Sequence, residues 1–124
     1  MNSKVTMVLR IILGLILIIF GANKFAGFMP APELPEAAGN FMGALAKTGY
    51  MFPLIGAVEV IVGLLLVLKK WVPFALILLA PVAVNMVLFH LKLAPGGIGP
   101  AAVVTILNVI LIYANWDKFK PLFD

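Results

Sequence analysis

A few polar residues lie within long apolar stretches of this sequence. Their side chains are the ones that could take part in chemistry there. The carboxyl group of Glu59 could carry a proton or anchor the polar head group of a ligand, and the ammonium group of Lys24 could pair with it. Asn85 and Asn108 could add hydrogen bonds. Because charges in hydrocarbon are costly, we expect such groups to face one another inside a bundle. The sequence therefore predicts a buried polar or ligand-binding site made of Lys24, Glu59, Asn85 and Asn108.

The same residues also have a structural interpretation. Glu59 could be a buried carboxyl, protonated or paired, that holds helices together, and the two asparagines could bridge neighbouring helices. The sequence leaves both interpretations of Glu59 open. We expect other basic side chains to reach lipid head groups at the membrane surface. These are Arg10, Lys69 and Lys70.

Several other chemistries lack the residues that they need. The chain contains no cysteine, which excludes disulfides and thiolate chemistry. A metal cluster needs several His, Cys or acidic ligands, so we expect no metal site. The single histidine, His90, also weighs against a haem. The net charge of +4 comes from lysines beside apolar stretches, which suits anionic lipid and does not indicate nucleic-acid binding.

Four apolar stretches must position these residues. Hydrophobic residues make up 64% of the 124 residues and charged residues 11%. Average soluble domains are roughly 45–50% apolar and about 25% charged. A helix needs about 20 apolar residues to cross a bilayer. The sequence predicts an all-α integral membrane four-helix bundle, up-down-up-down, in a single transmembrane domain of residues 1–124. The predicted spans are residues 5–25, 50–68, 71–91 and 99–116.

The first span could instead be a cleaved signal peptide. Lys4 and Arg10 precede the apolar run Ile11–Phe20, as in a secretory signal. No A-x-A cleavage site follows closely, however, and Asn23-Lys24-Phe25 is a poor context for cleavage. We therefore expect a retained helix.

Helical spacing predicts which faces of the spans meet. At 100° per residue, small and polar residues fall on one stripe of each span. These stripes hold Arg10, Gly14, Gly21 and Lys24; Gly56, Glu59 and Gly63; Pro81, Asn85 and Lys92; and Thr105, Asn108 and Asn115. Small residues allow close helix approach, so we expect the stripes to face inward and Asn85 and Asn108 to bond Glu59. His90 points about 140° away from Asn85, so we do not expect it in the same cluster.

The connections and the lysine distribution predict the topology. Residues 26–49 form a long outer loop in which residues 36–47 are either a short helix in the interface plane or an irregular cap on the bundle. Basic residues favour the cytoplasmic side, so we expect both termini there, in the inner (plasma) membrane. The expected cytoplasmic side holds Lys4, Arg10, Lys69, Lys70, Lys118 and Lys120, and the other side holds Lys24, Lys47 and Lys92.

The order of motifs along the chain resembles the DoxX family. The first span carries Arg10-x-x-Leu13-Gly14-Leu15 and Gly21-x-x-Lys24-Phe25, the second Gly56-x-x-Glu59-x-x-x-Gly63-Leu64, and each later span contains an Asn. The resemblance implies a four-helix inner-membrane protein of bacteria or archaea with recurring charged positions at Arg10, Lys24 and Glu59. It also implies a link to redox complexes, because the family is named after subunits linked to thiosulfate:quinone oxidoreduction, and related proteins aid the maturation of partners.

Three functions follow as hypotheses. The first is an accessory subunit of a redox or quinone-linked membrane complex, with a quinone as the candidate cofactor and another membrane protein or a second copy as partner. The second is a non-enzymatic assembly or lipid-organising protein. The third is a small-solute or proton-coupled transporter. We find no catalytic constellation that would make the chain an enzyme by itself.

Overall fold

The structure is a computed structural model that describes residues 2–27 and 33–124. The regular elements of these residues are all helices, and four of them are long and apolar enough to cross a membrane, which confirms the predicted bundle. Residues 28–32 of the predicted outer loop lie outside the described residues. In chain order the elements are α1 (Ser3–Ala26), α2 (Glu36–Lys47), α3 (Met51–Leu68), α4 (Val72–Lys92), η1 (Pro95–Gly97), α5 (Ile98–Ala114), α6 (Trp116–Phe119) and η2 (Lys120–Phe123).

The helix boundaries follow from local capping. Asn2 accepts a hydrogen bond from the Lys4 amide at 2.8 Å and thereby caps the start of α1. Lys69 ends α3 in the left-handed region, at φ 55°, and allows the tight turn into α4. The last long helix ends earlier than the predicted span, because Asn115 leaves helical geometry and its side chain donates to Leu111 O at 2.8 Å. Trp116 then begins the separate helix α6.

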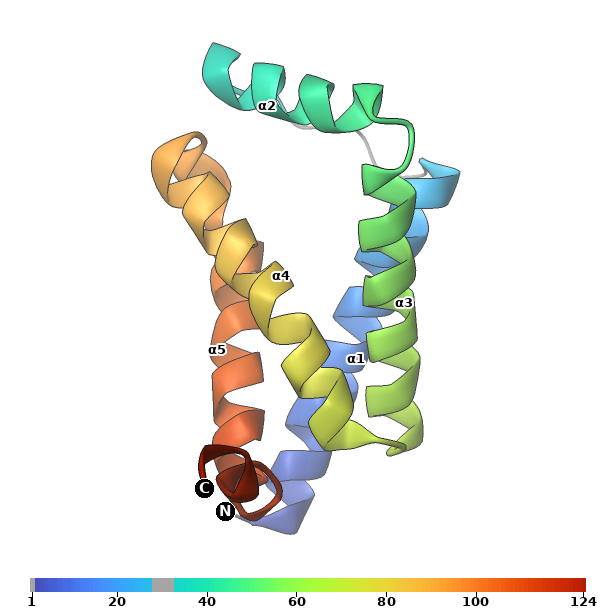
Figure 1. Ribbon diagram of the computed structural model, residues 1–124, viewed down its shortest axis with the longest axis vertical. Helices are drawn as coiled ribbons and strands as arrows, with labels where there is room; N and C mark the ends of the chain where they lie inside the picture. The colour runs from blue at the N-terminus through green and yellow to red at the C-terminus, as the bar shows by residue number, and fades with distance from the viewer. Residues whose placement is uncertain (1, 28–32) are drawn as a thin grey trace.

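The four long helices alternate in direction and spread apart toward one end (Figure 1). Both termini lie at one end of the bundle, which we call the terminus end. Of the two alternatives for residues 36–47, the structure has the short helix, α2, which lies across the opposite end; we call this the α2 end. The assignment of the terminus end to the cytoplasm stays a prediction.

Glycines hold α1 and α3 together. A Cβ atom at Gly14 would lie 2.8 Å from Gly63 O, and one at Gly21 would lie 2.8 Å from Gly56 O. These separations leave no room for a side chain, so the two backbones touch at both levels. The predicted small-residue stripes of the first two spans are therefore confirmed as a helix contact.

Two side chains of α5 donate hydrogen bonds to α4, at two levels along the bundle. The Asn108 amide donates to Leu76 O at 3.1 Å, and the Thr105 hydroxyl donates to Ala83 O at 3.4 Å. Both contacts lie close to Pro81, which has no N–H group to continue the helical ladder of α4. The bundle thus consists of two pairs, α1 with α3 and α4 with α5.

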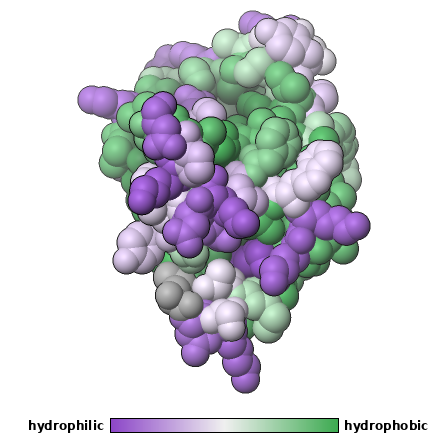
Figure 2. Space-filling model, turned by 60° about the horizontal axis from the view of Figure 1, so that its bottom comes forward, coloured by the Kyte–Doolittle hydropathy of each residue, from purple (hydrophilic) through white to green (hydrophobic). Residues whose placement is uncertain are grey.

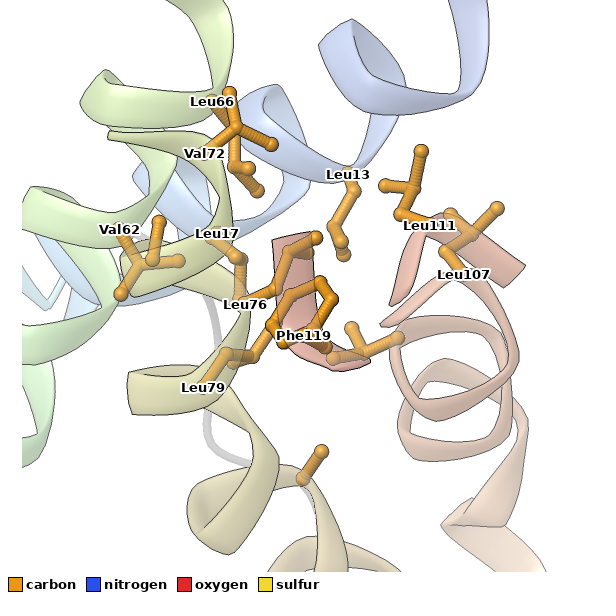
Figure 3. Close-up of a cluster of buried hydrophobic side chains, with 13 residues drawn as sticks. Leu13, Leu17, Val62, Leu66, Val72, Leu76, Leu79, Leu107, Leu111 and Phe119 are labelled. Carbon is orange, nitrogen blue, oxygen red and sulfur yellow. The ribbon is translucent and has the colours of Figure 1, made fainter. Parts of the chain in front are cut away.

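The two pairs pack against each other through a core in the terminus half of the bundle. The side chains of Leu13, Leu66, Leu76, Leu79 and Leu111 are 0% exposed. Figure 3 shows them converging from all four long helices, with Phe119 of α6 among them. The short α3–α4 turn and the folding back of α6 both close this half of the molecule.

The surface fits a membrane protein. Many large hydrophobic side chains are exposed along the four long helices, where lipid can cover them. Figure 2 brings the terminus end forward and shows hydrophilic side chains gathered there between hydrophobic flanks. Exposed lysines at this end come from several elements; they are Lys4, Lys69, Lys70, Lys118 and Lys120.

Candidate functional site

A cavity of about 650 Å³ lies in the α2 half of the bundle, between the two helix pairs. Its size is within the range of roughly 300–1,000 Å³ that is typical of small-molecule sites. All four long helices and α2 contribute to its wall, which is mostly apolar. The cavity therefore occupies the space that opens where the pairs spread apart.

The only ion pair among the described residues lies in the wall of this cavity. Lys24 Nζ is 2.6 Å from Glu59 Oε1, so the last turn of α1 is joined to the middle of α3. The Glu59 side chain is 1% exposed and that of Lys24 is 24% exposed. Apart from this contact, Glu59 Oε1 accepts no well-oriented hydrogen bond within the described residues. Lys24 is thus the partner of Glu59 Oε1 among the described residues, and both residues line the cavity.

α4 adds two more polar side chains to the wall. Asn85 lines the cavity and is exposed, so its amide is free to meet a ligand. His90 also lines the cavity, although its position about 140° from Asn85 around the helix gave no reason to expect it there. The reason is that the segment after α4 folds back. His90 Nδ1 lies 3.2 Å from Ala94 O, and Gly97 packs against the imidazole ring. The cavity wall therefore includes residues from more than one face of α4.

Helix α2 covers the cavity at the α2 end. Ala38 is 0% exposed and packs with Phe89 and Ala94 in a second, smaller core. The rings of Phe41 and Phe89 are 5.5 Å apart, and Met42 also lines the cavity. The apolar face of α2 is therefore the roof of the cavity. Side chains of α2 pack on Phe89 of α4 and on Ala94 in the segment that follows it.

Asn108 is not part of this wall. It is buried, and its amide bonds Leu76 O instead of Glu59, contrary to our expectation. Its position on α5 faces the neighbouring helix α4 in the terminus half, whereas Glu59 faces the cavity. Of the four residues predicted for the polar site, the structure brings Lys24, Glu59 and Asn85 to one cavity.

Arg10 lies away from the cavity, in the terminus half. Its side chain is 7% exposed, and its guanidinium donates to Leu66 O and, at 3.4 Å, to Val67 O. These carbonyls belong to the last turn of α3, where Leu66 O also accepts from the Lys69 amide at 3.3 Å. Arg10 thus caps α3 from a neighbouring helix. Contacts of Arg10, Lys69 and Lys70 with lipid head groups stay a prediction.

Sequence reasoning missed the aromatic part of the site. Phe20, Phe41, Phe52 and Phe89 all line the cavity. Their helices carry no polar stripe that points to them, because aromatic residues in apolar helices face lipid and interior equally well. One signal was present: Phe41, Met42 and Leu45 follow the spacing of one helical face in residues 36–47.

Comparison with known proteins identifies the family. The family model for DoxX matches residues 5–91, which is more than half of the chain. The matched region contains α2, α3 and nearly all of α1 and α4, and with them the residues of the ion pair. No curated protein and no solved structure matches the chain. The chain belongs to the DoxX family and is an integral membrane protein.

Proposed function

We propose that this DoxX family protein is the membrane subunit of a quinone-linked redox complex and that it holds a small amphipathic molecule in the cavity at its α2 end. The observation that carries the proposal is the cavity itself, which combines apolar walls with the Lys24–Glu59 ion pair. A quinone has the same division between a polar head and an apolar tail. The family resemblance supplies the link to redox complexes.

The packing of the bundle favours binding of a molecule over its transport across the membrane. Leu13, Leu76 and Leu111 fill the terminus half and are 0% exposed. A solute that reached Glu59 from the α2 end would meet this core before the opposite surface. The structure therefore supports a binding site more directly than the transport pathway that we also considered from sequence.

Purification tests the proposal. The protein would be extracted from its native membrane into nanodiscs, and all bound proteins and lipids would be identified by mass spectrometry. An unrelated four-helix membrane protein of similar size, prepared in the same way, is the control for bulk lipid. We expect a quinone, a redox-enzyme partner or both, enriched over that control.

A chain that emerges alone with bulk phospholipid would overturn this function. That result would favour the second hypothesis from the sequence, a non-enzymatic protein that assists the assembly of partners or organises lipid. In that case the ion pair would serve to join α1 to α3.

A further inference from the structure

Each end of the bundle limits access to the cavity. Helix α2 covers one end, with Ala38 buried against Phe89 and Ala94, and exposed residues such as Glu33 and Gly96 also line the cavity there. The other end is closed by the leucine core of the terminus half, where Leu17 contributes both to the core and to the cavity floor. A further route into the cavity passes between the long helices, whose outer faces are covered by hydrocarbon.

The space between α3 and α4 separates the two helix pairs on one side of the cavity. Contact between backbones closes α1 against α3, and hydrogen bonds join α4 to α5. α3 and α4 meet at the turn after Leu68 and move apart toward the α2 end (Figure 1). Ile55 of α3 and Asn85 of α4 both line the cavity, and Asn85 is exposed as well. These observations favour the space between α3 and α4 as a route into the cavity.

The charges in the wall disfavour an anionic ligand. Lys24 is already paired with Glu59, and Glu33 adds a second acidic group to the wall. A carboxylate or sulfonate would need to displace Glu59 from Lys24 in an apolar setting, where charged groups are costly. A hydroxyl or carbonyl group could instead share the existing pair through hydrogen bonds. The phenylalanines of the wall suit a flat apolar body.

We propose that the cavity takes an uncharged amphiphile dissolved in the bilayer. The molecule enters sideways between α3 and α4 and places a hydroxyl or carbonyl head group against the Lys24–Glu59 pair. This inference rests on the small-molecule binding proposed above, and it names the class of ligand and its route.

Native mass spectrometry of the protein in nanodiscs tests the ligand class. The probes share one octylphenyl body and differ in the head group: para-octylphenol, octylbenzene and para-octylbenzoate. We expect para-octylphenol to bind about tenfold more tightly than either other probe, a difference that direct counting of bound molecules resolves. Equal binding of all three probes, or tighter binding of para-octylbenzoate, would overturn the inference.

A pair of variants on one helix tests the route. Ile55→Trp puts a bulky side chain on the α3 side of the proposed route, whereas Ile61→Trp puts the same side chain on the lipid-facing surface of α3, where Ile61 is 51% exposed. We expect Ile55→Trp to slow both the association and the dissociation of para-octylphenol about tenfold and Ile61→Trp to leave both rates unchanged. Unchanged rates in Ile55→Trp, with helical content equal to wild type, would contradict sideways access.

The double variant Lys24→Met with Glu59→Leu tests the head-group contact. It should bind para-octylphenol and octylbenzene equally, because the polar pair is gone. If the preference for the hydroxyl group persists, the anchor lies elsewhere. These binding tests do not depend on redox chemistry. A failed search for a quinone or a redox partner would therefore leave the ligand class intact, and failed binding of these probes would leave the redox function untouched.

Discussion

The same four helices build two different halves, one packed and one hollow. In the terminus half, leucines from every long helix are 0% exposed and the helix pairs touch. In the α2 half, the pairs separate around a cavity of about 650 Å³ that contains an ion pair. Polar residues of the first half, such as Arg10 and Asn108, bond backbone carbonyls. The polar residues of the second half face open space, which is what a ligand-binding function requires.

The connections explain why the halves differ. At the terminus end, only Lys69 to Trp71 separate α3 from α4, so the helices cannot spread. At the α2 end, α1 and α3 are joined by a long segment that contains α2 and reaches across to Phe89. Pro81 lies between the halves on α4 and removes one backbone hydrogen bond there. The short link therefore holds the two helix pairs together at the terminus end, whereas the long segment carries α2 across the end at which the pairs separate.

Truncating a leucine of α4 should give the largest loss of stability and so the strongest test of the difference between the packed and the hollow half. Leu79 is 0% exposed in the packed half, and Met86, two turns later, lines the cavity. We expect Leu79→Ala to lower the free energy of unfolding by about 2–5 kcal/mol, because the surrounding side chains cannot fill the void. Met86→Ala should cost less than about 1 kcal/mol, since its side chain already borders empty space. Equilibrium unfolding in mixed micelles measures both, and equal losses would show that the α2 half is packed.

Adding one methyl group between α1 and α3 should have the next largest effect. A Cβ atom at Gly63 would lie 2.6 Å from Gly14 O, and backbone cannot move aside as a flexible side chain can. We expect Gly63→Ala to destabilise the protein by about 1–3 kcal/mol. The control is Gly43→Ala on α2, where no atom lies within 4 Å. It should be neutral or slightly stabilising, because alanine favours helix over glycine. A neutral Gly63→Ala would contradict the close contact.

The ion pair should show a smaller, measurable coupling. Lys24→Met and Glu59→Gln each leave one partner of the pair without its counterpart, and the double variant removes both charges. We expect a coupling free energy of about 1 kcal/mol, within the usual range of about 0.5–3 kcal/mol for residues in contact. Lys24 is 24% exposed, so partial solvation weakens the interaction. A double-mutant cycle of unfolding free energies measures the coupling, and strict additivity would mean that the two groups are independent.

Much of the fold, and the ion pair, could be predicted from sequence. The four spans follow from hydrophobic length, and the contact between α1 and α3 follows from glycines at helical spacing. The meeting of Lys24 with Glu59 is predictable for a physical reason: charges within hydrocarbon seek partners. These features depend on one helix or on one pair of helices.

The rest of the site depends on how the two pairs diverge, which no single helix encodes. The placement of Asn108 against Leu76 O, instead of Glu59, follows from the rotation of α5 relative to α4. His90 reaches the cavity because the segment to Gly97 folds back, and Phe41 reaches it because α2 crosses the bundle. Helical periodicity gives the direction of a side chain around its own axis, but not the angle between axes. That angle decides whether a polar stripe meets another helix or an open space.

The smallest expected effects come from the two hydrogen bonds between α5 and α4. Comparing them would show where the packed half of the bundle ends. Asn108 donates to Leu76 O at 3.1 Å within the packed half, whereas Thr105 donates to Ala83 O at 3.4 Å, one turn closer to the cavity. Interhelical hydrogen bonds in membranes contribute about 0.6 kcal/mol on average. We expect Asn108→Leu to cost at least that much, because the replaced amide is buried and its bond is shorter, and Thr105→Val to cost less. Unfolding free energies of both variants in mixed micelles would check the order. If Thr105→Val is the costlier change, the hydrogen bond nearer the cavity holds α4 in place, and the rigid part of the bundle extends past Pro81 toward the binding site.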